Sequence, residues 1–458
     1  METKKNKRST FSGKIGFVLS AAGASVGLGN IWRFPYLAAK YGGGIFLLIY
    51  ILLALTFGYT MIVAESALGR MTRKSPVGAF KAFGKKAGWL SFGGWINAII
   101  PVLIVPYYSV IGGWVIKYLI EYVKGNGTKL AADGYFSEFI SNGASTEICF
   151  VIFCMFTLSI IYAGVRNGIE RVSKFMMPIL VVLSVIIAIY SVTRPGAIEG
   201  VKYFLVPNLK NFSWMTVVAA MGQMFYSLSI AMGILITFGS YMKKDSSIED
   251  STRNVEVFDT AIAIMAGLMI IPAVFAFSGG DPDTLQAGPA LMFITIPKVF
   301  ANMGFGTVVG ILFFLLVLFA AVTSSIALTE SAVSTFEDEL HWSRKKSTVF
   351  MGMVMLLLGT LSCLGYGPLA NFKILGMQFL DFFDFITNSV MMPIAAIATC
   401  LLVSKVVGVD KIEEEIKKDG QVFRRKKIFC FMIKYLCPLF AAIILISSVA
   451  NAFGIITM

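Results

Sequence analysis

The chain has 458 residues, 57% of them hydrophobic and only 14% charged, and its formal net charge is +13. A soluble protein is charged at about a quarter of its positions, so this composition argues against a soluble enzyme and indicates a polytopic α-helical membrane protein. The positive charge does not indicate nucleic acid binding, because Lys and Arg fall in short segments between apolar runs, as the positive-inside rule describes. The expected surrounding is a lipid bilayer.

Apolar runs recur eleven times along the chain, each near the roughly 20 residues that cross about 30 Å of hydrocarbon. We expect spans at residues 13–39, 42–69, 87–123, 148–164, 175–192, 213–241, 257–277, 307–336, 348–364, 372–403 and 428–456. The basic segments place the tail 1–12 and the loop 404–427 in the cytosol, and eleven spans then carry the C-terminus to the outer side of a plasma membrane. In the outer loop 278–306, an apolar middle at 289–300 predicts a helical lid.

Two spans cannot be continuous helices. Residues 23–35 of the first span hold three glycines, an asparagine, an arginine and a proline, and residues 226–233 of the sixth span are Tyr-Ser-Leu-Ser-Ile-Ala-Met-Gly. Lipid cannot hydrogen-bond freed backbone groups, so such breaks persist only where protein or a polar cavity surrounds them. Because the breaks lie five spans apart, we expect two repeats of opposite topology, 13–194 and 195–403, with a binding site at the bilayer midplane. Residues 428–458 add one further span.

Single polar residues within the spans differ in how strongly each one indicates a function. Asp259 is a functional candidate by itself, because a carboxylate inside a bilayer is costly and is rarely kept without a role. Thr323 and Ser324, taken alone, indicate only hydroxyls that bond to the preceding turn of their helix. The six cysteines show no CxxC spacing and indicate small core residues without a disulfide or a metal. The single histidine, His341, leaves no histidine for a metal site or a proton relay.

Three motifs carry a family resemblance: Gly-Leu-Gly-Asn-Ile-Trp-Arg-Phe-Pro-Tyr at 27–36, Gly-Gln-Met-Phe-Tyr-Ser-Leu-Ser at 222–229 and Thr-Ser-Ser-Ile-Ala-Leu at 323–328. In this order and on these spans they resemble the neurotransmitter:sodium symporter family, and most of all its bacterial eleven-span amino-acid transporters. The resemblance implies an all-α LeuT-type fold, a 5+5 inverted repeat with broken first and sixth helices and one extra C-terminal span. It also implies a carrier, not an enzyme, that imports amino acids with sodium by alternating access.

The resemblance implies two sodium sites built from oxygen ligands, which a hard cation prefers. The first sodium site would consist of the carbonyl of Ser25, the side chains of Asn30, Ser227 and Asp259, and the substrate carboxylate. The second sodium site would consist of the carbonyls of Gly23, Val26 and Ala320 and the hydroxyls of Thr323 and Ser324. Asp259 stands where many relatives have an asparagine, so its negative charge implies transport without the chloride that animal members bind.

The family also implies a substrate site. The amino-acid carboxylate would accept from the N–H groups of Leu28 and Gly29, at the positive end of a half-helix, and from the hydroxyl of Tyr108. The ammonium would meet the carbonyls of Ser25 and Tyr226 and the hydroxyl of Ser229, and the side chain would lie among Ile104, Tyr108, Tyr226, Met232, Ser324 and Leu328. Without the family, this set would indicate ordinary core. The pocket is apolar and uncharged, which favours a hydrophobic or aromatic L-amino acid, and the deformable Met232 suits a large ring.

Two gates follow from the same resemblance. Arg33 and Asp384 would form the outer gate, just beyond the first break. Arg8 and Asp338 would form the inner gate, beside Phe11, where relatives usually have a tryptophan. An exposed ion pair is worth only about 0–1 kcal/mol, which suits a gate that must open.

Further residues would support the moving parts. Gly168 and Pro178, separated by nine residues, mark where span five would unwind and admit water to the second sodium site, since proline lacks the donor that closes a helical turn. Glu65 and Gln223 are intramembrane polar groups that would brace the two breaks.

Two other functions stay open from the sequence. Broken helices and Asp259 could form the active site of a membrane-embedded enzyme, but we find no paired intramembrane carboxylates, histidine cluster or activated nucleophile. A substrate sensor could keep the same site without transport, although the intact gate residues favour a carrier.

Overall fold

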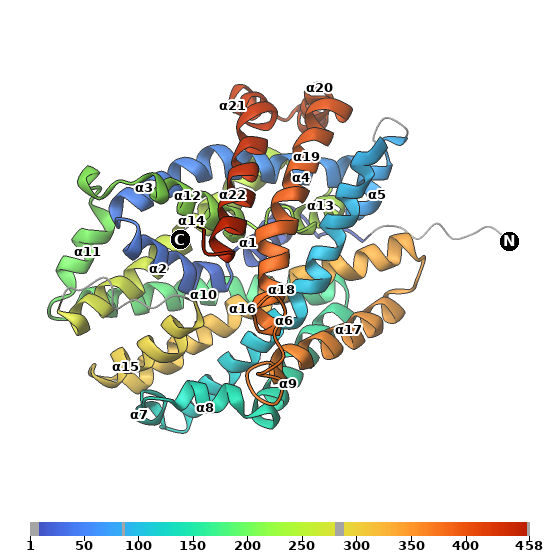
Figure 1. Cartoon of the computed structure of the whole chain (residues 1–458). Coiled ribbons are helices and arrows are strands. Elements are labelled where there is room, and N and C mark those ends of the chain that lie inside the picture. The colour runs from blue at the N-terminus through green and yellow to red at the C-terminus, as the bar shows by residue number, and fades with distance from the viewer. Residues whose placement is uncertain (1–8, 85–87, 280–287, 456–458) are drawn as a thin grey trace.

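The computed structural model describes residues 9–84, 88–279 and 288–455, and within these ranges the chain folds as a bundle of helices (Figure 1). Nine runs in these ranges are long and apolar enough to cross a membrane: Gly44–Thr72, Gly88–Val123, Gly143–Tyr162, Val165–Val192, Ile248–Ser278, Gly306–Glu339, Arg344–Leu364, Phe379–Val407 and Lys426–Ala452. Two broken spans accompany them. In one, α1 (Lys14–Ser25) and the run Gly29–Lys40 meet at 53°. In the other, α12 (Trp214–Ser227) and α13 (Ile234–Tyr241) flank residues 228–233. Together they correspond to the eleven predicted spans.

The remaining elements lie either within these spans, where short π-helical turns divide some of the helices, or between them. In chain order they are α2 (Phe34–Lys40), α3 (Gly44–Leu53), α4 (Tyr59–Thr72), α5 (Pro76–Lys81), α6 (Ser91–Val123), α7 (Gly127–Leu130), α8 (Tyr135–Ser141), α9 (Gly143–Tyr162), η5 (Val165–Glu170), α10 (Arg171–Val192), α11 (Ala197–Leu205), α14 (Ile248–Ser278), η8 (Leu291–Thr295), α15 (Ile296–Ala301), α16 (Gly306–Glu339), α17 (Arg344–Leu364), α18 (Phe379–Asp384), η9 (Phe385–Met391), α19 (Met392–Leu401), α20 (Val409–Ile416), α21 (Lys426–Phe431) and α22 (Cys437–Ala452).

The two breaks are held open by side chains from intact helices. In the second break, Ser229 and Ala231 adopt left-handed φ angles of 54° and 59°, a conformation that costs a non-glycine residue roughly 1–2 kcal/mol. Glu65 of α4 counteracts this cost, because its Oε1 accepts a hydrogen bond from the Ala231 N–H at 2.8 Å. In the first break, the Gln223 amide of α12 donates to the Gly29 carbonyl at 3.1 Å. These contacts confirm the bracing role predicted for Glu65 and Gln223.

The broken first span lies in the middle of the bundle (Figure 1). Its α1 half packs against α10, α14 and α16, while α2 packs against α14 and α12. The second broken span places α13 along α4 and α12 along α3. The long α6 runs beside α16 and α9, so both breaks face the same central volume from several sides. The packing therefore surrounds the freed backbone groups with protein, as the bilayer requires.

Four predicted span boundaries are wrong. Residues 165–174, expected as a basic connection, are helical, and the fourth and seventh spans begin earlier than predicted, at Gly143 and Ile248. Polar residues at these ends cap the helices and do not terminate them: the side chain of Asn142 accepts from the Ser145 N–H, and Ser247 accepts from the Asp250 N–H. The tenth span begins later, at Phe379, because residues 372–378 form a turn closed by backbone bonds between Ile374 and Met377.

The predicted lid is helical where it is described, although residues 280–287 of its loop lie outside the described ranges. η8 and α15 form one short bent helix that is too short to span. Phe293 of η8 stacks on Phe136 at a centroid distance of 5.1 Å, and its carbonyl accepts from the Tyr118 hydroxyl of α6 at 2.8 Å. These contacts fix the lid against the third span.

A buried ion pair ties α4 to the segment between the last two spans. Arg70 of α4, whose side chain is fully buried, donates from Nε to Glu415 of α20 at 2.8 Å and from its guanidinium to the Ser246 carbonyl at 2.6 Å. The segment 404–427, predicted as a loop, therefore contains the helix α20 and reaches back to the second span. Removing one partner of a buried ion pair typically lowers the free energy of unfolding by about 3–5 kcal/mol, so this contact strongly stabilises the packing of α20 against α4.

Candidate functional site

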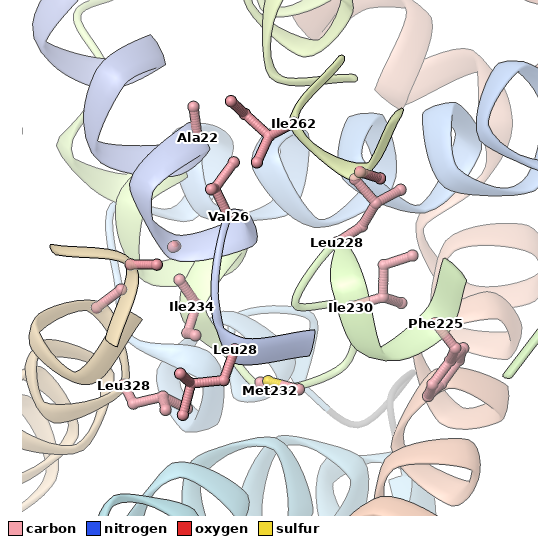
Figure 2. Packing of buried hydrophobic residues seen from close by; sticks show 14 of the residues in the cluster. Ala22, Val26, Leu28, Phe225, Leu228, Ile230, Met232, Ile234, Ile262 and Leu328 are labelled. Atoms are coloured by element: carbon pink, nitrogen blue, oxygen red, sulfur yellow. The ribbon is translucent and has the colours of Figure 1, made fainter. Parts of the chain in front are cut away.

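A small central cavity of about 30 Å³ lies where the two breaks meet. Its described lining includes all ten residues predicted for the substrate site, together with four neighbours: Ala24, Ser25, Gly27, Leu28, Gly29, Asn30, Ile104, Tyr108, Tyr226, Ser227, Ser229, Met232, Ser324 and Leu328. None of these described residues carries a charge. Figure 2 shows three apolar members of the lining, Leu28, Met232 and Leu328, gathered beside the broken first span.

Backbone groups of the first break lie beside this cavity, and side chains from other spans form hydrogen bonds with them. The Leu28 N–H donates to the Tyr108 hydroxyl at 3.4 Å, and the Ser229 hydroxyl donates to the Ala24 carbonyl at 3.0 Å. A Cβ added to Gly29 would lie 2.6 Å from the Tyr226 ring, so only glycine lets the ring approach the backbone this closely. The cavity thus has backbone groups of the broken first span at one side and an aromatic ring at the other.

Three of the four residues predicted for the first sodium site, Asn30, Ser227 and Asp259, form one hydrogen-bonded cluster around the Asp259 carboxylate, which is fully buried. Its Oδ1 accepts from the Asn30 amide at 2.9 Å and from the Ser227 hydroxyl at 2.8 Å. The side-chain oxygen Oδ1 of Asn30 in turn accepts from the Gly27 N–H at 3.2 Å. Ser25 lines the adjoining cavity. Three spans therefore meet at a single carboxylate next to the cavity.

Tyr50 of α3 is a member of this cluster that the sequence did not single out. Its hydroxyl donates to Asp259 Oδ2 at 2.9 Å and lies 3.3 Å from the Ser227 hydroxyl. A tyrosine in an apolar run looks like an ordinary core residue, and it stands far from Asp259 in the chain. The unsatisfied hydrogen-bonding capacity of a buried carboxylate was the one signal that a further donor had to exist.

The residues predicted for the second sodium site lie where the end of α1 meets α16. The Ser324 hydroxyl is 3.3 Å from the Gly23 carbonyl and 3.5 Å from the Val26 carbonyl, and it also contacts the Ala24 carbonyl at 3.2 Å. The Thr323 hydroxyl instead donates within its own helix, to the carbonyls of Phe319 and Ala320 at 2.9 and 3.2 Å. The ordinary back-bonded geometry thus applies to Thr323, whereas Ser324 reaches across to α1.

A second, larger cavity of about 380 Å³ lies beyond Tyr226, which lines both cavities. Arg33 and Asp384 line it too, but among the described residues no ion pair joins them within 4.0 Å. The Arg33 guanidinium lies over the Tyr226 ring at 5.3 Å. Asp384 accepts from the Tyr107 hydroxyl at 3.1 Å and from the Asn388 amide at 2.6 Å. We call this space the vestibule.

The N-terminal segment packs against α1 and α13, one half of each broken span. Phe11 is 1% exposed and packs edge-on against Phe17, Phe238 and Tyr241, and its N–H donates to the Tyr241 carbonyl at 3.1 Å. Phe11 is therefore held in place by a cluster of aromatic rings.

The predicted inner-gate pair is only partly described. Asp338 accepts from the Ser75 N–H at 2.6 Å, whereas its predicted partner Arg8 lies outside the described residues.

The segment predicted to unwind begins the fifth span and is helical in this structure. Gly168 lies in η5 and donates to the Gly164 carbonyl at 2.9 Å, and Pro178 lies inside α10. A Cβ at Gly168 would lie 2.0 Å from the Ile160 carbonyl oxygen, so this turn requires glycine. The sulfur of Met177 approaches the face of Gly23, which places this helix beside the predicted second sodium site.

Comparison with known proteins agrees with this architecture. The profile of the Sodium:neurotransmitter symporter family matches residues 8–131 and 135–455. The chain is 34% identical, over 98% of both chains, to the uncharacterized sodium-dependent transporter YhdH of Bacillus subtilis strain 168. It is 27% identical to the human sodium- and chloride-dependent GABA transporter 2, over 90% of this chain and 75% of that one. A crystal structure of MhsT in complex with L-phenylalanine matches it with a TM-score of 0.86 at 34% identity, covering 96% of this chain and 100% of that one.

The family profile and the sodium-dependent relatives cover nearly the whole chain, and the two broken spans and their central cavity have the arrangement of the LeuT-type fold. The chain therefore belongs to the sodium:neurotransmitter symporter family, as a multi-pass, sodium-dependent membrane transporter and not an enzyme.

Proposed function

We propose that this symporter imports a hydrophobic or aromatic L-amino acid by alternating access, with two sodium ions and without chloride. The observation that carries the proposal is the central cavity, whose described lining is uncharged and lies between the first break and the Asp259 cluster. An amino acid would place its carboxylate on the N–H groups of Leu28 and Gly29 and its ammonium on carbonyls and the Ser229 hydroxyl. The charged ends of the substrate would thus be satisfied while its side chain meets apolar residues.

The proposed substrate class follows from the apolar side chains that line the central cavity. Ile104, Met232 and Leu328 offer apolar surface, and the Tyr226 ring covers the opening toward the vestibule. Methionine deforms easily and suits a large ring, so we rank tryptophan, phenylalanine and tyrosine above leucine. The match to MhsT, whose structure contains L-phenylalanine, supports this ranking.

Ion coupling would follow from sharing the substrate carboxylate. The first sodium ion would bind this carboxylate together with Ser25, Asn30, Ser227 and Asp259. Without the ion, the substrate would leave a buried negative charge unpaired, so the two ligands bind more tightly together than separately. The second ion would join α1 to α16 through Gly23, Val26, Ala320, Thr323 and Ser324.

Chloride independence would follow from Asp259 itself. Its carboxylate already receives hydrogen bonds from Asn30, Ser227 and Tyr50. A fixed negative charge here would balance the sodium ions, which leaves no need for a diffusible anion. This proposal depends on the charge and not on the hydrogen bonds alone.

The conformation would be outward-facing. The vestibule side corresponds to the cell exterior in the proposed topology, with the N-terminus cytosolic, the C-terminus outside and the repeats 13–194 and 195–403 inverted in a plasma membrane. Arg33 and Asp384 would approach each other as the outer gate closes, while Arg8 and Asp338 would separate on the inner side. Unwinding between Gly168 and Pro178 would then admit water to the second ion.

Uptake into proteoliposomes tests the proposal. Labelled phenylalanine, tryptophan, leucine, glycine and lysine are each supplied with an inward sodium gradient, with the gradient collapsed by an ionophore as control, and with chloride replaced by gluconate. We expect sodium-driven accumulation of the aromatic amino acids, unchanged in gluconate. Absence of sodium-driven uptake of any amino acid would contradict symport, and binding without uptake would favour a sensor. Preferential uptake of glycine or lysine would contradict the substrate class.

A further inference from the structure

Glu170, at the start of the fifth span, binds the segment that precedes the first span. Its carboxylate is 2% exposed and accepts from the Ser12 N–H at 2.8 Å, from the Ser12 hydroxyl and from the Lys174 ammonium at 2.6 Å. Lys174 also lies 3.1 Å from the Ser12 hydroxyl. A buried carboxylate with one cation and two further donors is a well-satisfied group, because hydrogen bonds to charged groups are among the strongest in proteins. We call Ser12, Glu170 and Lys174 the N-terminal latch.

The N-terminal latch packs directly against α1. Gly16, one turn into α1, faces the carboxylate so closely that an added Cβ would lie 2.4 Å from Glu170 Oε1. The other end of the same helix holds Gly23, where an added Cβ would lie 3.1 Å from the Thr323 side chain. The helix is thus fixed at one end by Glu170 and at the other by the residues proposed for the second sodium site.

The latch also lies within the segment proposed to unwind. Glu170 follows Gly168 by two residues, and both precede Pro178 in the same helical run. Any rearrangement that opens the start of the fifth span would displace the Glu170 carboxylate from Ser12. Movement of α1 away from the bundle would separate the same pair of groups from the other side.

We propose that Glu170 is a positioning residue that joins the inner end of α1 to the start of span five, so that the inner gate opens only when both move together. The inference rests on the proposed alternating access and extends it to a contact outside the ion and substrate sites. Loss of the latch raises the population of the inward-open state. Since sodium binds the closed state, its apparent affinity falls as that population grows.

Thiol accessibility in the full-length reconstituted protein tests the latch directly. Ser20 of α1 is 2% exposed, and Ser20→Cys provides a reporter whose maleimide labelling is measured at saturating sodium, with the protein lacking this substitution giving the background of native cysteines. We expect Glu170→Gln to speed labelling about tenfold and to raise the sodium concentration for half-maximal uptake similarly, as loss of a charge-assisted bond implies. Ser12→Ala keeps the backbone N–H and should speed labelling about threefold.

Asp250→Asn is the matched control. Asp250 also pairs with α1, through Lys14 at 3.7 Å, but both side chains are about two-fifths exposed, at 42% and 44%. An exposed pair contributes little, so labelling should stay at the wild-type rate. A variant that is merely unstable lowers maximal uptake and leaves the sodium dependence unchanged, which separates damage from positioning.

The outcomes decide the proposal. Wild-type labelling in Glu170→Gln overturns it, as does equal acceleration in Asp250→Asn. If Glu170→Gln does not fold, the labelling rate of Ser12→Ala is used instead, and a wild-type rate in that variant overturns the proposal. Failure of the proposed transport function would appear separately, as absence of amino-acid uptake by the wild-type chain, because the labelling needs no substrate.

Discussion

Replacing Asp259 by asparagine removes one buried charge and keeps nearly the same shape. Two of its three hydrogen-bond donors, the Ser227 and Tyr50 hydroxyls, lie 2.8 and 2.9 Å from the carboxylate and can also bond to an amide oxygen. Two unit charges about 4 Å apart interact by about 4 kcal/mol at an effective dielectric constant of about 20. Part of this is offset because the neutral amide costs less to bury, so we expect a net loss of ~2 kcal/mol in sodium binding, or roughly thirtyfold in affinity.

The assay is sodium-dependent uptake of phenylalanine in proteoliposomes, with the sodium concentration varied in chloride and in gluconate. In Asp259→Asn, we expect half-maximal uptake at roughly thirtyfold higher sodium in gluconate, and partial recovery when chloride is present to supply the missing negative charge. Tyr50→Phe is the control, because it removes one donor and keeps the charge. It should shift the sodium dependence by only about threefold to tenfold, because the other two donors stay in place and one hydrogen bond typically contributes about 0.5–1.5 kcal/mol net.

Two results would refute this reasoning. An unchanged sodium dependence in Asp259→Asn would mean that the carboxylate does not face a sodium ion. An equal loss in Tyr50→Phe and Asp259→Asn, with no response to chloride, would mean that the cluster acts through its hydrogen bonds and that its charge is incidental.

Three further predictions concern the central cavity. Gly29→Ala should lower substrate affinity by more than about tenfold while the protein remains folded, because the added Cβ would lie 2.6 Å from the Tyr226 ring and overpacking costs about 1–3 kcal/mol; equilibrium binding measures it, and wild-type affinity would contradict the geometry. Met232→Phe should shrink the pocket and shift the preference from tryptophan toward leucine by about tenfold in a competition assay; an unchanged ranking would show that Met232 does not set the pocket size. Ser324→Ala and Thr323→Val should each raise the sodium requirement by about tenfold, since each removes one of the two hydroxyls proposed to bind the second ion; an unchanged sodium requirement in either variant would contradict that hydroxyl's role as a ligand.

The breaks were predictable because glycine and polar residues in an apolar run conflict with a continuous lipid-exposed helix. The same logic identified Asp259, and the family motifs placed the cavity residues together. Tyr50 was missed because its partner lies in a distant span and nothing in the local pattern separates it from core. The failed boundaries at 165–174 and 248–256 share one cause: charged residues end the membrane-crossing stretch without ending the helix. Whether Arg33 and Asp384 are paired depends on conformation, which a sequence does not specify.

The buried ion pair between Arg70 and Glu415 limits how far this carrier can be shortened. The tenth span ends at Val407, so a ten-span version cut there would retain both breaks and the central cavity. It would also leave the Arg70 guanidinium buried without its carboxylate, a change that typically costs about 3–5 kcal/mol. Since Arg70 also bonds to the Ser246 carbonyl, the loss would reach the connection between the sixth and seventh spans. The eleventh span and its preceding segment are thus part of the folding unit, and a minimal transporter derived from this chain must keep them or first replace Arg70 with an apolar residue.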